Sequence, residues 1–194
     1  MKTNFLLLTL AASFFSANLQ AQTEQINDSL NSEVLDEVLI QAVRATKNTP
    51  MAFSNLSKEE LAKRNLGQDI PVLMNFMPAV VTTTDAGNGV GYTGIRVRGS
   101  DGTRVNVTLN GIPYNDSESH GSFWVNMPDF ASSLENLQLQ RGVGTSTNGS
   151  GAFGASLNLL TDAYSEKGYG EISNSFGSFN TRKHTVKFST GLKP

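Results

Sequence analysis

The sequence contains no cysteine among its 194 residues and only two histidines. Without thiols the chain can form neither a disulfide framework nor a cysteine zinc site, and it lacks the acylated cysteine of a lipoprotein. Its formal net charge of −2 supplies no positive field that would attract nucleic acid. We therefore expect no metal site, no cofactor and no nucleic-acid partner.

A recognisable set of catalytic residues is also missing. Ser119 and His120 stand beside the acids Asp116 and Glu118 in one short polar stretch. Nucleophilic catalysis needs a nucleophile, a base and a group that orients the base, and these usually come from separate parts of a fold. The sequence therefore does not indicate an enzyme.

Long hydrophobic runs are absent as well, because the apolar segment at residues 5–15 is too short for a membrane-spanning helix. Lys2 precedes this segment and the small residue Ala21 follows it, in the order typical of an export signal. We predict a signal peptide over residues 1–21; a buried N-terminal helix is the alternative.

An acidic region follows the predicted signal. Residues 22–35 are polar and predict a flexible tether, and residues 22–43 contain five acids and no lysine or arginine. Within residues 36–45, the β-prone run Val38-Leu39-Ile40 lies between polar neighbours. Such a strand can pair with the exposed sheet edge of another protein. Pairing within its own domain is the alternative.

Glycine is concentrated in one region, with thirteen of the 18 glycines between Gly87 and Gly154. Residues 149–154 match the spacing GxGxxG, which in a nucleotide site lies between a strand and a helix. Here the following residues, 155–160, are typical of a strand, and the alternation in 137–140 predicts a preceding strand with one buried face. We interpret the glycines as a structural turn and reject a phosphate site.

Other segments carry local signals of helix, strand and turn. Ser57 and Glu60 form a capping box that predicts a helix to about Asn65, and Asp69 with Pro71 predicts the start of a second helix. Asn110-Gly111 predicts a tight turn. We expect strands at 80–84, 95–98 and 105–109, and a helix from Pro128 to about Glu135.

Two segments near the end of the chain alternate between polar and apolar residues. In 168–176 and 181–190, apolar side chains such as Ile172 and Val186 alternate with polar ones such as Lys183 and Lys187. Strands of this length with one apolar face are typical of a transmembrane barrel. A soluble hairpin would show the same pattern.

Taken in chain order, these motifs resemble the N-terminal part of TonB-dependent outer-membrane receptors. DEVLIQA at residues 36–42 is similar to their TonB box, although it has Gln41 where many receptors have Thr. IRVRG at 95–99, VNVTLNGIP at 105–113, LENLQLQRG at 134–142 and GSGAFGA at 149–155 are similar to plug-domain motifs. HGSFWVNMPDF at 120–130 resembles receptors of the Bacteroidetes type.

The resemblance implies an α+β fold: a small mixed-sheet plug domain with short helices and long loops, followed by the first two strands of a transmembrane β-barrel. The implied domains are a signal peptide (1–21), an acidic periplasmic tether (22–35), a TonB-box-like strand (36–45), a plug (46–165) and the first barrel hairpin (168–194). We expect the rest of the barrel to lie beyond Pro194.

The resemblance also implies a function and functional residues. The receptor would couple to TonB and take up a scarce nutrient, most often a ferric siderophore or similar iron complex, across the outer membrane. Its partners would be TonB, the missing barrel, the nutrient and lipid. A freestanding periplasmic plug-like binding module is the alternative. The residues that bind TonB would be Glu37, Val38, Leu39, Ile40 and Gln41. Arg98 and Arg141 would lock the plug to carboxylates of the barrel. The substrate contacts would be Tyr92, Tyr114, His120 and Trp124.

Overall fold

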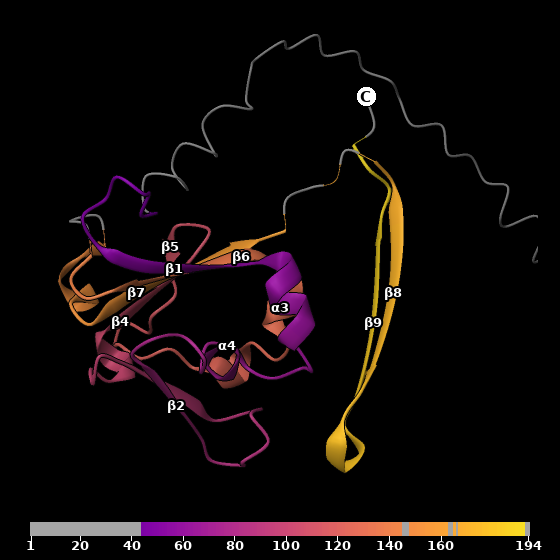
Figure 1. The fold of residues 1–194 in the computed structure, drawn as a ribbon, viewed down its shortest axis with the longest axis horizontal. Coiled ribbons are helices and arrows are strands. Elements are labelled where there is room, and N and C mark those ends of the chain that lie inside the picture. The colour runs from indigo at the N-terminus through magenta and orange to yellow at the C-terminus, as the bar shows by residue number, and fades with distance from the viewer. Residues whose placement is uncertain (1–43, 145–147, 163–164, 166, 193–194) are drawn as a thin grey trace, which may run out of the picture. The chain divides into compact units, whose positions relative to one another are not determined.

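The computed structural model describes residues 44–144, 148–162, 165 and 167–192 (Figure 1). The predicted signal peptide, tether and TonB-box-like strand, apart from its last two residues, lie outside the described residues. No helix in the described part of the chain is long and apolar enough to cross a membrane.

The central element is a five-stranded mixed sheet with the strand order β1-β6-β7-β4-β5. Strands β4 and β7 are parallel, and the other neighbouring strands are antiparallel. The mixed sheet with few short helices confirms the predicted fold class. The strands are β1 (Ala52–Ser57), β4 (Val105–Leu109), β5 (Ile112–Pro113), β6 (Leu134–Arg141) and β7 (Ala155–Thr161).

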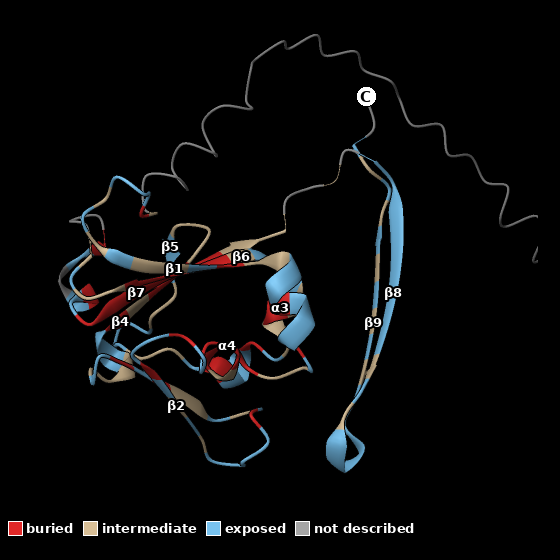
Figure 2. Ribbon diagram, in the orientation of Figure 1, coloured by how far each residue is buried: buried red, intermediate tan, exposed pale blue. Residues whose placement is uncertain are grey.

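One face of this sheet is apolar and forms the core. Leu139 of β6 lies opposite Leu157 of β7, and Leu137 lies opposite Leu159, all with an exposed fraction of 2% or less. Two helices contribute to the same core: α3 (Lys58–Arg64), which begins directly after β1 with the predicted capping box, and α4 (Ile70–Leu73). Figure 2 shows the buried interior of β6 and β7 in red.

The other face of the sheet is polar but also buried, which corrects the prediction that β6 has one buried face. Gln138 and Gln140 are 2% and 1% exposed. Gln138 lies opposite Asn158 of β7, and the Oγ of Thr108 donates to the Oδ1 of Asn158 over 2.6 Å. Alternation of apolar and polar residues predicts one buried and one exposed face, whereas here the polar side chains hydrogen-bond to one another within a covered face.

A second, two-stranded sheet consists of β2 (Val80–Thr84) and β3 (Thr93–Val97). The glycine-rich loop between them is fastened at its end by Asp69, whose Oδ2 accepts hydrogen bonds from the Gly91 N–H at 3.0 Å and the Thr93 hydroxyl at 2.9 Å. Asp69 is 1% exposed, so this loop is fixed to the residue that precedes α4.

The predicted helix from Pro128 to Glu135 is wrong. Asp129 has a φ of 49°, in the left-handed region, so it cannot continue a right-handed helix. A short 3-10 turn, Phe130–Ser133, follows, and β6 begins at Leu134. Further 3-10 turns lie at Gly102–Arg104, Trp124–Asn126, Ser150–Ala152 and Ser178–Asn180.

The predicted C-terminal hairpin is present as β8 (Tyr169–Phe176) and β9 (Arg182–Ser189). The two strands pair antiparallel over their whole length, from Tyr169 opposite Ser189 to Phe176 opposite Arg182. This register places Ile172 beside Val186 on one face and Glu171 beside Lys187 on the other.

Candidate functional site

The hairpin β8–β9 has two chemically different faces. Ile172, Phe176, Val186 and Phe188 share one face and are 69–83% exposed. The polar residues of β9 that alternate with them are all half-buried. The predicted alternation is therefore confirmed, and the polar face is the one that contacts the rest of the described chain.

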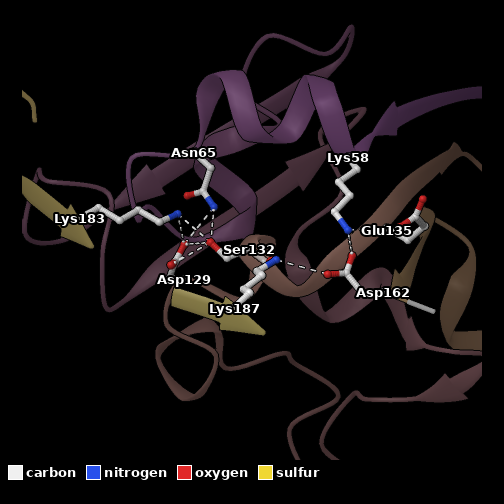
Figure 3. A network of polar contacts seen from close by, with 8 residues as sticks. All are labelled: Lys58, Asn65, Asp129, Ser132, Glu135, Asp162, Lys183 and Lys187. Carbon is white, nitrogen blue, oxygen red and sulfur yellow. Dashed lines mark hydrogen bonds and ion pairs between the residues drawn. The ribbon is translucent and has the colours of Figure 1, made fainter. Parts of the chain in front are cut away.

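Lys183 makes the first of two polar contacts with the sheet domain (Figure 3). Its Nζ lies 2.8 Å from the Oδ1 of Asp129 and 2.7 Å from the Oγ of Ser132. Asn65, the C-cap residue of α3, donates to both of these acceptors over 2.9 and 3.0 Å. The left-handed turn at Asp129 thus places its carboxylate against a lysine of β9. Asn65 of the sheet domain already holds this carboxylate by a hydrogen bond.

Lys187 makes the second contact, four residues further along β9 on the same face. Its Nζ lies 3.3 Å from the Oδ2 of Asp162, and it also donates to the backbone carbonyl of Ser132. The other oxygen of Asp162 pairs with Lys58 at 2.7 Å, and Lys58 is also 3.6 Å from Glu135. Asp162 therefore bridges a lysine of α3 and a lysine of the hairpin (Figure 3).

The charges of this second contact are mutually stabilised. Burial by itself raises the pKa of Asp162, but the hydrogen bond from Lys58 and the charge of Lys187 together hold this pKa below its usual range. The hydrogen bond to Asp162 raises the pKa of Lys58 against the opposing effect of burial. Asp162 and Lys58 therefore both stay ionised across the neutral pH range.

A hollow of about 100 Å³ lies between the hairpin β8–β9 and the sheet domain and is lined by residues of both. Polar side chains of β8 and β9 line one side, and residues of α3 and the turn before β6 line the other. An interface of partly exposed ion pairs with such a hollow is held by charge and hydrogen bonds rather than by close apolar packing. Separating it costs much less than opening a hydrophobic core.

The structure places the two predicted lock residues near one another. Arg98 has a φ of 51°, and its Nη1 lies 2.8 Å from the position that a Cβ on Gly142 would take. The Nη1 of Arg141 donates to the Oγ of Ser54 on β1 over 2.8 Å. Arg141 thus braces β1 against β6, and the expected carboxylates of a barrel wall stay a prediction for both arginines.

The four predicted substrate contacts fall into two groups. Tyr92 is 69% exposed in the loop before β3, and His120 is exposed with a φ of 57°. Trp124 is only 3% exposed and Tyr114 packs against the core. Contact with a substrate stays a prediction for all four residues. The indole of Trp124 also forms part of the wall of a hollow of about 260 Å³ next to β3 and β4.

Sequence reasoning did not identify Asp129 and Asp162 as partners of Lys183 and Lys187. The alternation in β9 placed the two lysines on one face, but nothing local linked them to acids elsewhere in the chain. Among the residues that the structure describes, no group of three or more histidine, cysteine, aspartate or glutamate side chains could hold a metal ion.

Comparison with known proteins identifies relatives. A probable TonB-dependent siderophore receptor, PirA of Acinetobacter baumannii, is 25% identical over an alignment of 174 residues. The match covers 84% of this chain and 23% of that receptor. The ferripyoverdine receptor of Pseudomonas aeruginosa has the same fold at a TM-score of 0.60 and 17% identity, covering 77% of this chain and 19% of the receptor chain. The ferric yersiniabactin receptor FyuA of Yersinia pestis matches at a TM-score of 0.55 and 17% identity, over 74% and 22% of the two chains.

The chain therefore spans less than a quarter of the length of these relatives, all of which are receptors. The Bacteroidetes type indicated by residues 120–130 stays a prediction. The family described as TonB-dependent Receptor Plug Domain matches residues 45–156. Because this match covers more than half of the chain, the protein belongs to the family of TonB-dependent receptor plug domains.

Proposed function

We propose that this chain is the N-terminal part of an outer-membrane receptor in which the plug domain gates a β-barrel and couples to TonB. The transported nutrient is a ferric siderophore or a similar iron complex. The relative from A. baumannii, described as a siderophore receptor, supports this substrate class. The plug and the TonB-box-like strand face the periplasm, after export directed by residues 1–21.

The observation that carries this proposal is the two-faced hairpin. A barrel strand alternates between a lipid-facing and a lumen-facing residue. In β9, Val186 and Phe188 point away from the plug, whereas Lys183 and Lys187 bind plug acids. A plug inside a barrel would contact the wall through the polar, lumen-facing side of such strands, so we assign β8 and β9 to the barrel wall.

The polar interface suits a plug that must move during transport. Two partly exposed ion pairs hold the hairpin and the plug together, and they can re-form after they separate. Arg98 and Arg141 supply further cations for carboxylates of the remaining barrel. Tyr92, Tyr114, His120 and Trp124 are the proposed contacts with the nutrient. Tyr92 and His120 are exposed on loops, and Tyr114 and Trp124 pack against the core.

TonB binds residues Glu37 to Gln41 by strand addition, in which backbone hydrogen bonds carry the pulling load. Leu39→Pro in the receptor completed by its barrel should abolish site-specific crosslinking to TonB and uptake of radiolabelled iron. Proline removes a backbone donor and does not fit a paired strand.

The matched control is Leu30→Pro, which places the same residue in the acidic tether and should leave both readouts intact. If Leu39→Pro transports iron at the normal rate, the assignment of the TonB box is wrong.

A further inference from the structure

The segment that leads into β1 is attached to the polar face of the sheet at Ala45, seven residues before the strand, by a side-chain amide. The Oε1 of Gln138 accepts a hydrogen bond from the Ala45 N–H at 2.7 Å, and its Nε2 donates to the Ala45 carbonyl at 3.0 Å. One glutamine thus makes the same pair of bonds to Ala45 that a neighbouring strand would make. The sheet topology alone does not show this attachment.

Other residues hold the Gln138 amide in a single orientation. Its Nε2 also donates to the Oδ1 of Asn55 on β1 over 2.8 Å, and its Oε1 also accepts from the Nε2 of Gln140 over 2.9 Å. The amide therefore makes four hydrogen bonds, which is all that its two donors and two lone pairs allow. Gln138 and Ala45 are 2% and 6% exposed, so water does not compete for these bonds.

A third contact lies on the same face of β6. Arg44 donates from its Nη1 to the Oδ1 of Asn136, two residues before Gln138 in the strand. The residues after Ala45 form a turn in which the Thr46 N–H donates to the Oγ1 of Thr49. Strand β1 begins at Ala52 and pairs with β6 over six residues, from Ala52 opposite Arg141 to Ser57 opposite Asn136.

We propose that Gln138 is a docking site for the peptide at Ala45, a clamp that fixes the point where the N-terminal arm leaves the plug and that opens first when this arm is pulled. Only the source of the pull, TonB bound to residues 37–41, rests on the proposed function. The clamp consists of a few side-chain bonds, whereas β1 is held by a ladder of six paired residues.

Opening the clamp has a limited mechanical consequence. It releases the turn at residues 46–51 while β1 stays paired with β6. Six residues extend by about 20 Å at most. The arm can thus lengthen by less than this span, because the folded turn already covers part of it, before any strand of the sheet separates.

Limited proteolysis tests the clamp because trypsin has one site inside it and one beside it. Arg44 is half-buried and held, whereas Lys47 is exposed in the following turn. The readout is the cleavage rate after Arg44 divided by the rate after Lys47 in the full chain. Cleavage of a native protein reports the population of the locally open state.

Gln138→Glu should raise this ratio at least about tenfold, because a carboxylate cannot donate to the Ala45 carbonyl or to Asn55. Asn55→Ala, a change at an exposed residue of β1, removes one of the four bonds and should raise the ratio about threefold. The matched control Gln68→Glu introduces the same charge at a half-buried glutamine before α4 and should leave the ratio unchanged.

Protection of Arg141 from trypsin shows that each variant is folded. If Gln138→Glu loses this protection, Asn55→Ala decides the outcome. Unchanged ratios in the folded variants overturn the clamp. The assay contains neither TonB nor an iron complex, so this failure would leave the transport proposal intact, and failure of the Leu39→Pro test would leave the clamp intact.

Discussion

Asp162→Lys is expected to detach the hairpin β8–β9 from the plug. Asp162 is the shared partner of Lys58 and Lys187, and its side chain is only 23% exposed. Reversing its charge would place three ammonium groups together, with the partly exposed Glu135 beside Lys58 as the remaining carboxylate. Loss of a partly buried pair costs about 2 kcal/mol, between the values for exposed and for buried pairs, so the detached population should rise roughly 30-fold.

Single cysteines can measure this detachment, because the chain has no cysteine of its own. Thr185 lies on the half-buried polar face of β9 and lines the hollow against the plug, whereas its neighbour Val186 is 69% exposed on the opposite face. The readout is the rate of thiol modification of Thr185→Cys divided by the rate for Val186→Cys. Asp162→Lys should raise this ratio, and an unchanged ratio would show that the ion pairs do not hold the hairpin.

A control variant separates the loss of this ion pair from a general effect of the added positive charge. Asp85→Lys makes the same change of net charge in an exposed loop and should leave the ratio unchanged.

Acid should reproduce the effect in the unsubstituted protein. The pKa of Asp162 is lowered in the folded state, so its stabilising contribution is present above the unfolded value of about 3.9 and is lost as the pH falls through the lower folded value.

The second large effect is expected for Gly154→Val, directly before β7. A Cβ on Gly154 would lie 2.7 Å from the backbone oxygen of Arg104 and 2.8 Å from the Cβ of Ser100. The same close approach allows the Gly154 N–H to donate to Arg104 over 3.0 Å and the Gly142 N–H to donate to Gly154 over 2.9 Å. Because backbone atoms cannot move aside locally, we expect a loss of roughly 3 kcal/mol of stability.

Thermal unfolding followed by the fluorescence of Trp124, the single tryptophan, measures this loss. A loss of that size should lower the Tm by about 10 °C. Gly151→Ala is the matched control from the same loop, because a Cβ there meets nothing within 4 Å and should change the Tm little. Equal Tm values for the two variants would contradict a packing role for Gly154.

Local signals predicted much of the fold. The capping box at Ser57 and Glu60 forms as expected and begins α3, and Asn110-Gly111 turns with positive φ at both residues. The run at 155–160 is a strand, which removes the helix that a phosphate site would need. These features depend on neighbours in the sequence, and such neighbours can be read without a structure.

Features that depend on distant contacts were missed. Strand β1 was not predicted, because Leu56 is its only buried residue and its pairing with β6 decides its conformation. The helix expected from Pro128 fails because Asp129 adopts a left-handed turn that binds Asn65 and Lys183, 64 residues before it and 54 after it. The ion pairs of the candidate site also depend on distant contacts. The sequence of β9 places its two lysines on one face, but only the fold brings Asp129 and Asp162 next to them.

The central claim is that β8 and β9 begin a barrel wall around this plug. Reading the gene beyond the codon for Pro194 tests it most directly. We predict that the frame continues through about twenty further strands with the same alternation, to complete a barrel of 22 strands. A stop codon directly after Pro194 would contradict the receptor and favour a freestanding periplasmic module.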